Sequence, residues 1–209
     1  MFKYFLVLIT LFLATAANAK SPCFHYPGGV SCGKGVVDGV GGTGTVNIDG
    51  TTVTRHTIAH GDLSAHNATL SDVVVYGNAA MAEVRLHTLL VHGTAALTHV
   101  TMSGGIIIRG PAHITQGEVL GQVRLDGGVN ATSTHFAKTI LLIKHSGTFS
   151  HCIIAAIQAK DIPAGTIIAI KDDTIVNGDI TFIGTPGIVH LSKDSKISGK
   201  VINGKVVTV

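Results

Sequence analysis

The chain has 209 residues, of which 45% are hydrophobic, 13% charged and 5% aromatic, and it contains 26 glycines and no tryptophan. This composition is too apolar for a disordered protein and too rich in glycine for a helical one. The formal net charge is only +3 and lysine and arginine form no cluster, so the sequence gives no indication of nucleic-acid binding.

Residues 1–19 have the organisation of a secretory signal peptide. Lys3 precedes the short apolar run FLVLITLFLA, and Ala17-Asn18-Ala19 matches an A-x-A cleavage site. A membrane-spanning helix needs about 20 apolar residues, so we expect cleavage after Ala19 rather than an anchor. The sequence therefore predicts an exported protein that resides in the periplasm, at the cell surface or in the medium.

Residues 20–42 form a glycine-rich lead-in that contains Cys23 and Cys32. In an oxidising compartment two cysteines this close in sequence are expected to form a disulfide. The alternative is a metal site that also uses His25, although a closed zinc site needs four ligands. The third cysteine, Cys152, lies in the apolar stretch HCIIAAI, where we expect a buried, inert thiol.

Residues 43–58 alternate apolar and polar side chains, as a half-buried strand does. From about 57 to 137 the chain then repeats one unit every 16 or 17 residues, with Gly61, Gly77, Gly93, Gly110 and Gly127 as anchors. Five columns stay apolar, at −4, −2, +2, +4 and +9 from each anchor. In that order they are Val73, Leu89, Ile106 and Val123; Ala59, Val75, Val91, Ile108 and Leu125; Leu63, Ala79, Ala95, Ala112 and Val129; Ala65, Met81, Leu97, Ile114 and Ala131; and Leu70, Leu86, Met102, Val119 and Phe136.

Self-similarity at this period predicts a solenoid. We expect an all-β, single-domain parallel β-helix over residues 43–209, with 16–17 residues per turn and a right-handed winding, the hand favoured for parallel crossovers. Residues 138–160 do not fit the repeat and could form an expanded rung or a short helix. Residues 161–209 resume the alternation and are expected to form the last rungs and a cap.

The repeat LLVHGTAALTHVTMSGGIIIRGPAHI resembles that of bactofilins and similar polymer-forming β-helix proteins. The phrase DSKISGKVINGKVV is similar to rungs of secreted bacterial adhesin passengers. The first resemblance implies a right-handed parallel β-helix with a scaffolding role. Bactofilins act on the cytoplasmic side of the membrane, whereas this chain carries an export signal, so we carry over the architecture rather than the cytoskeletal role.

The residue immediately before each anchor glycine should point outward, because its neighbour toward the N-terminus belongs to an inward column. These residues are His60, Tyr76, His92 and Arg109, followed by Asp126. The first four form a candidate binding ladder for an anionic or sugar surface, or simply a solvated face. A metal site is not expected, because Tyr76 separates the two histidines, and no cofactor is implied.

Catalytic β-helices need clustered carboxylates, either as an acid/base pair or to hold calcium. The one dense acidic group here is Asp172, Asp173 and Asp179, which lies beside the turn dipeptide Asn177-Gly178 and is typical of turns. We therefore expect a non-catalytic structural, scaffolding or adhesive protein. Its expected partners are polysaccharide or protein surfaces of the cell envelope or exterior, with self-association through strand edges. The alternative is a polysaccharide-active lyase or hydrolase.

Overall fold

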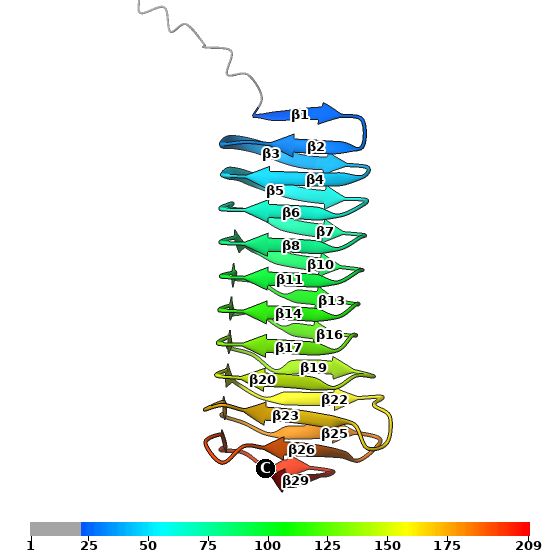
Figure 1. Ribbon diagram of the computed structural model, residues 1–209, viewed down its shortest axis with the longest axis vertical. Helices are drawn as coiled ribbons and strands as arrows, with labels where there is room; N and C mark the ends of the chain where they lie inside the picture. The colour runs from blue at the N-terminus through cyan, green and yellow to red at the C-terminus, as the bar shows by residue number, and fades with distance from the viewer. Residues whose placement is uncertain (1–21) are drawn as a thin grey trace, which may run out of the picture.

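The computed structural model describes residues 22–209, which form a β-solenoid of about 11 turns (Figure 1). The predicted signal peptide lies outside the described residues. All regular structure from residue 22 onward is β-strand, so this part of the chain offers no helix that could cross a membrane. The prediction of an all-β parallel solenoid is confirmed.

The chain coils through three sheets, of which the 7-stranded sheet begins only at Arg85; from there on, each turn adds one strand to each sheet. All strand pairs are parallel except the first, β1 with β2. The 12-stranded sheet contains β1 (Cys23–Tyr26), β2 (Gly29–Cys32), β4 (Thr45–Asp49), β6 (Leu63–His66), β8 (Ala79–Ala82), β11 (Ala95–Thr98), β14 (Ala112–Thr115), β17 (Val129–Thr132), β20 (Gly147–Ser150), β23 (Ile167–Lys171), β26 (Gly187–Leu191) and β29 (Gly204–Thr208). The 10-stranded sheet contains β3 (Gly35–Gly42), β5 (Thr51–Ala59), β7 (Asp72–Val75), β10 (Thr88–Val91), β13 (Ile106–Ile108), β16 (Val123–Leu125), β19 (Ile140–Ile143), β22 (Ile157–Lys160), β25 (Ile180–Ile183) and β28 (Val201–Ile202). The 7-stranded sheet contains β9 (Arg85–Leu86), β12 (Thr101–Met102), β15 (Glu118–Val119), β18 (His135–Phe136), β21 (Ile153–Ile154), β24 (Ile175–Val176) and β27 (Lys196–Ile197).

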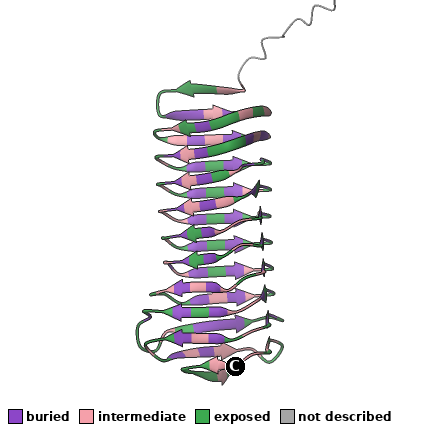
Figure 2. Ribbon diagram, turned by 180° about the vertical axis from the view of Figure 1, so that it is seen from behind, coloured by how far each residue is buried: buried purple, intermediate pink, exposed green. Residues whose placement is uncertain are grey.

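The five apolar columns of the repeat all point into the rod, and every residue in them is buried. Burial alternates with exposure along the strands of the regular repeat, as Figure 2 shows, because successive side chains of a strand lie on opposite faces of the sheet. A sixth inward column, seven residues after each anchor, was not predicted. It contains the glycine Gly117 and the polar Thr134 in line with Val84 and Val100, so its hydrophobic signal is weaker.

The anchor glycines stack at the corner between the 10-stranded and 12-stranded sheets. The amide of Gly77 donates to the carbonyl of Gly61 at 2.9 Å, and the amide of Gly93 donates to that of Gly77 at 3.0 Å. A Cβ atom on Gly93 would lie 2.5 Å from the carbonyl oxygen of Gly77, which is closer than any side chain tolerates. The close approach of successive rungs therefore requires glycine at this corner.

The corner between the 12-stranded and 7-stranded sheets is made differently. In seven successive rungs one non-glycine residue has a left-handed conformation with φ between 47 and 58°, a region that L-residues seldom adopt. Because these side chains are polar and varied, the sequence carries no marker for this turn. The residues are Asn67, Glu83, His99, Gln116, Ser133, His151 and Asp172.

Residues 138–160 continue the three sheets as β19 to β22, so the alternative of a short helix there is wrong. The rung from Val129 to its partner Gly147 has 18 residues, and that from Gly147 to Ile168 has 21. A Cβ atom on Gly147 would lie 2.8 Å from the ring of Phe149, which fills this part of the core. The apolar column therefore contains a glycine, and the sequence repeat is lost although the strands stay in register.

The parallel stack begins before residue 43, the boundary that the sequence predicts. β2 pairs with β4 and β3 pairs with β5, so most of the glycine-rich lead-in forms the first turn of the solenoid. β1 folds back antiparallel on β2 and places Cys23 opposite Cys32, and the two are joined by a disulfide. The predicted disulfide is confirmed, and the alternative of a metal site at these cysteines is wrong.

Candidate binding face

The four residues predicted as an outward ladder lie along one side of the 10-stranded sheet, at the carboxyl ends of four neighbouring strands. His60, Tyr76, His92 and Arg109 each follow the last inward residue of β5, β7, β10 and β13, beside the glycine corner. Each amide bonds to the rung before it; the amide of His92, for example, donates to the carbonyl of Val75 at 2.9 Å. The backbone register thus sets the four side chains directly above one another.

The side chains of this ladder form one continuous stack. The rings of His60 and Tyr76 are 5.0 Å apart and inclined by 10°, and those of Tyr76 and His92 are 4.9 Å apart and inclined by 25°. The guanidinium of Arg109 lies next, with its Nη1 3.2 Å from Nδ1 of His92. These spacings match the distance of about 4.8 Å between neighbouring strands, so the stack follows from the fold itself.

The stack decides which atoms remain available to a partner. A guanidinium can only donate, so Nδ1 of His92 accepts from Arg109 and the neutral imidazole carries its proton on Nε2. Both faces of Tyr76 are covered by the neighbouring imidazoles, which leaves its edge and hydroxyl exposed. The ladder therefore presents a row of hydrogen-bonding edges and one cation, not open aromatic faces.

A second outward column runs along the middle of the same strands and was not singled out in the sequence. It places Ile58, Val74, Leu90 and Ile107 in register, one per rung, and Arg124 follows them. Ile107 is 40% exposed. Their alternation with buried neighbours marks these residues as outward, but aliphatic side chains on a solvent face are easily read as core. The ladder thus borders an aliphatic strip.

The ladder ends at Arg109, and the next residue of the same column is Asp126. Its carboxylate accepts from Nε of Arg124 at 2.8 Å and from Nη2 of Arg124 at 3.1 Å. This contact raises the pKa of the Arg124 guanidinium above its ordinary value. The ion pair engages the carboxylate that follows Arg109 in this column, and Arg109, the cation of the ladder, has no carboxylate partner among residues 22–209.

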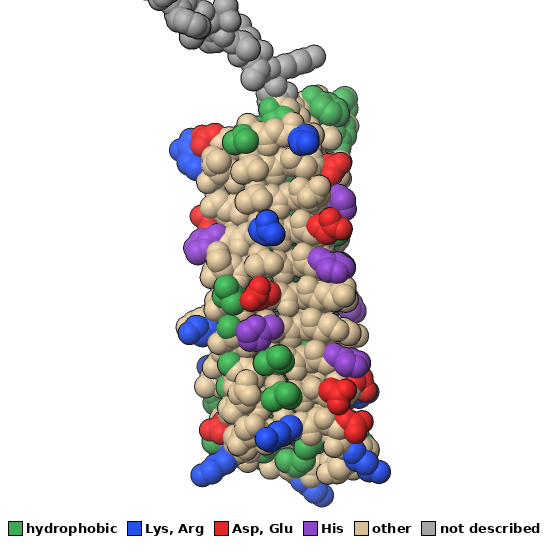
Figure 3. All heavy atoms as spheres, turned by 90° about the vertical axis from the view of Figure 1, so that its left-hand side faces the viewer, with side chains coloured by type: hydrophobic (Ala, Val, Ile, Leu, Met, Phe, Trp, Pro, Cys, Tyr) green, Lys and Arg blue, Asp and Glu red, His purple; other side chains and the backbone are tan. Residues whose placement is uncertain are grey.

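The histidines do not form a metal centre in the part of the chain that the structure describes, residues 22–209, where no three His, Cys, Asp or Glu side chains converge suitably. On the side of the rod shown in Figure 3, acidic, basic and histidine side chains are interspersed rather than gathered in one patch. His66 contacts Asp49 at 3.3 Å and His87 contacts Ser103 at 3.0 Å, so several histidines form local polar pairs between adjacent rungs.

The one dense acidic group of the sequence, Asp172, Asp173 and Asp179, serves the turns. Asp172 and Asp173 both have left-handed backbone angles, with φ of 49° and 58°. The carboxylate of Asp172 accepts from the Ser150 hydroxyl at 2.6 Å, and that of Asp179 accepts from the amide of Lys200 at 2.7 Å. These bonds link neighbouring rungs and give the carboxylates structural contacts.

The free cysteine is part of the core. Cys152 is fully buried, and its Sγ lies 3.2 Å from the carbonyl oxygen of Ser150. Burial raises the pKa of the Cys152 thiol, because desolvation disfavours the thiolate. The group therefore lacks the accessible thiolate that nucleophilic chemistry requires.

Comparison with known proteins adds no relative: no protein-family model, no curated protein and no solved structure matches the chain.

Proposed function

We propose that the protein is an exported, non-catalytic β-solenoid that serves as a structural, scaffolding or adhesive rod and binds a partner along one side. The observation that carries this proposal is the continuous stack of His60, Tyr76, His92 and Arg109, whose ring spacings of 5.0 and 4.9 Å repeat a row of polar edges along the rod. Such a row suits an extended partner better than a compact substrate.

Two further features support this reading. Asp172 and Asp179 bond across rungs rather than toward a common space, whereas a polysaccharide lyase or hydrolase needs converging carboxylates. The resemblance of the repeat to that of bactofilins also favours scaffolding. Export is supported by the sequence of residues 1–19 and by the Cys23–Cys32 disulfide, since disulfides persist in oxidising compartments.

The test is a binding screen of the purified protein on arrays of glycans and of envelope and extracellular proteins. We expect wild type to bind at least one class of surface and the triple variant His60→Ala/Tyr76→Ala/His92→Ala to lose that binding. Tyr76→Phe separates the two roles of the tyrosine, because it keeps the stack and removes the hydroxyl.

A matched control changes three outward residues of the 12-stranded sheet, Thr98→Ala/His113→Ala/Thr115→Ala, which lie on β11 and β14. This variant should bind as wild type does. Equal binding by both triple variants would exclude the ladder as the site. Cleavage of a glycan that Asp172→Asn abolishes would establish the enzymatic alternative instead.

A further inference from the structure

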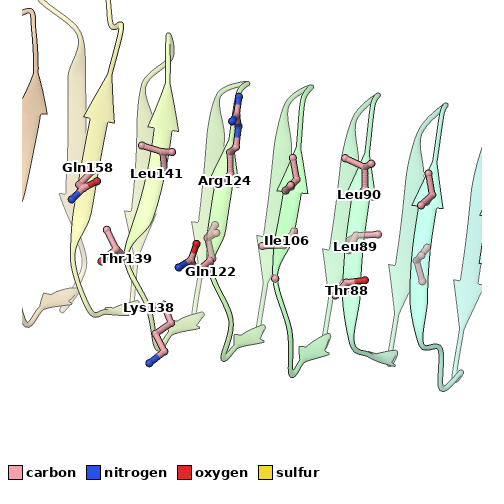
Figure 4. A pocket seen from close by; sticks show the side chains of 15 residues that line it. Thr88, Leu89, Leu90, Ile106, Gln122, Arg124, Lys138, Thr139, Leu141 and Gln158 are labelled. Atoms are coloured by element: carbon pink, nitrogen blue, oxygen red, sulfur yellow. The ribbon is translucent and has the colours of Figure 1, made fainter. Parts of the chain in front are cut away.

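A groove of about 800 Å³ runs beside the ladder on the outward side of the 10-stranded sheet. Its lining extends from Val74 on β7 to Gln158 on β22, across six successive strands. At about 4.8 Å between strands, the groove is about 24 Å long. Figure 4 shows its side chains arriving from one rung after another, so the groove lies along the rod axis.

The two walls of the groove differ in chemistry. One wall is the aliphatic strip, which runs through Leu90 and Ile107 and resumes at Leu141. Arg124 occupies the same position on the rung between Ile107 and Leu141 and interrupts the strip with a cation. The other wall carries Thr88 and Gln122, with hydroxyl and amide groups at the start of the strands. Glycine between them, at position 105, leaves the wall open.

The charged side chains are distributed unevenly along the groove. Its lining contains two cationic side chains, Arg124 and Lys138, and no acidic one. Arg124 is held by Asp126, whereas Lys138 makes no hydrogen bond or ion pair with another residue in 22–209. At the opposite end Asp72, which precedes the lining residue Val73 in sequence, accepts from the Thr88 hydroxyl at 2.5 Å. An anionic ligand is therefore favoured toward Lys138 and disfavoured toward Asp72.

We propose that this groove binds a linear acidic polysaccharide that lies along the rod. Sugar hydroxyls bond to Thr88, Gln122 and Thr139, the apolar ring faces lie on the aliphatic wall, and a carboxylate pairs with Lys138. An extended glycan advances by roughly one rung per sugar, which lets each rung contact one unit. An acyl chain fits less well, because it would strip water from the hydroxyl and amide wall without replacing its hydrogen bonds.

This inference rests on the proposed binding role of the same face, and its test uses hexagalacturonate as the probe. In isothermal titration calorimetry we expect wild type to bind the hexamer and neutral cellohexaose to bind more weakly. Lys138→Glu should lower the affinity for hexagalacturonate by about tenfold or more, since it replaces a charge-assisted contact by repulsion. Added salt should weaken binding in wild type.

Two further variants make the result specific. Ile107→Glu places an anion in the middle of the groove and should also abolish binding of the hexamer. Lys171→Glu makes the same charge change on β23 of the 12-stranded sheet, where the side chain is exposed, and should leave binding unchanged. Circular dichroism and melting curves should be recorded to check that each variant is folded.

Several outcomes would overturn the proposal. They are absence of hexagalacturonate binding, equal losses with Lys138→Glu and Lys171→Glu, tighter binding to anionic phospholipid vesicles, and dimerisation through this face in analytical ultracentrifugation. If hexagalacturonate fails but the ladder variant loses a partner on the arrays, the binding face stands and only the ligand assignment fails. If neither probe nor array gives binding, both proposals fail.

Discussion

The glycine corner offers the sharpest test of the fold, because two neighbouring glycines differ in what surrounds them. A Cβ atom on Gly127 would overlap the carbonyl group of Gly110 and lie 2.8 Å from the nitrogen of Pro111. A Cβ atom on Gly128 would find its nearest neighbour, the carbonyl oxygen of Ser146, at 3.9 Å. Alanine is therefore excluded at one position and accommodated at the next.

The expected magnitude follows from the atoms involved. Overpacking usually costs about 1–3 kcal/mol, and at Gly127 both colliding groups are backbone, so we expect about 3 kcal/mol. For a protein of this size 1 kcal/mol shifts the melting temperature by about 2–4 °C, so Gly127→Ala should melt about 6–12 °C below wild type. Gly128→Ala should be neutral or slightly stabilising, since alanine restricts the unfolded chain.

The assay is thermal unfolding followed by circular dichroism on wild type and the two alanine variants under one set of conditions. Because stacked repeats can unfold in steps, calorimetry should be run alongside to show whether Gly127→Ala lowers one transition or all of them. Equal melting temperatures for the two variants would refute the reasoning, as would a Gly127→Ala variant as stable as wild type.

Three further predictions concern single contacts. Burial raises the pKa of Cys152, so iodoacetamide at pH 8 should leave this thiol unmodified in the native protein and alkylate it only in urea. Mass spectrometry measures the alkylation, and a modified Cys152 in the native protein would contradict the prediction. Replacing Cys23 and Cys32 by serine should lower the free energy of unfolding by about 2–3 kcal/mol, measured by urea titration; an unchanged midpoint would show that the hairpin holds without the bond. The Arg55 hydrogen bond holds the pKa of Asp38 below its ordinary value, so Arg55→Gln should raise the carboxylate titration midpoint seen by NMR, with no change in melting temperature because both groups are exposed.

The core was predictable because its signal is repeated. A column such as Val75, Val91, Ile108 and Leu125 contains large aliphatic residues at each turn, and a strand buries alternate positions. Where a rung fills the core in another way, the same signal fails. Around Phe149 the aromatic ring occupies the space that an aliphatic residue fills elsewhere, so the sequence shows irregularity where the strands continue without interruption.

The candidate site was predictable in part. The ladder residues were found because each precedes an anchor glycine, and their column follows from the strand period. Their mutual stacking could not be read from spacing alone, because it depends on side-chain rotamers that the sequence does not give. The groove was missed since its aliphatic wall, with Leu90 and Ile107, has the composition of core and only the register reveals that it faces outward.

The lead-in was misjudged for a related reason. β3 contains four glycines in eight residues and no run of large aliphatic side chains, so the composition placed it in a glycine-rich lead-in outside the β-helix. In the structure the strand keeps its place through pairing with β5, in a register that shifts between Val37 and Gly39. Backbone hydrogen bonds to a neighbouring rung thus define a strand whose own residues give little hydrophobic signal.

The repetition of rungs also sets the size of partner that this face can hold. Each turn contributes one edge to the ladder, and a single edge gives a weak, solvent-exposed contact, so affinity must come from several rungs engaged by one connected partner. The ladder starts at His60 and ends at the charged side chain of Arg109. On the next rung Asp126 and Arg124 neutralise each other. The ladder therefore spans four rungs, and the groove beside it continues along the rod axis to Lys138 and beyond. A partner long enough to reach from one to the other would contact both, which a compact molecule cannot do.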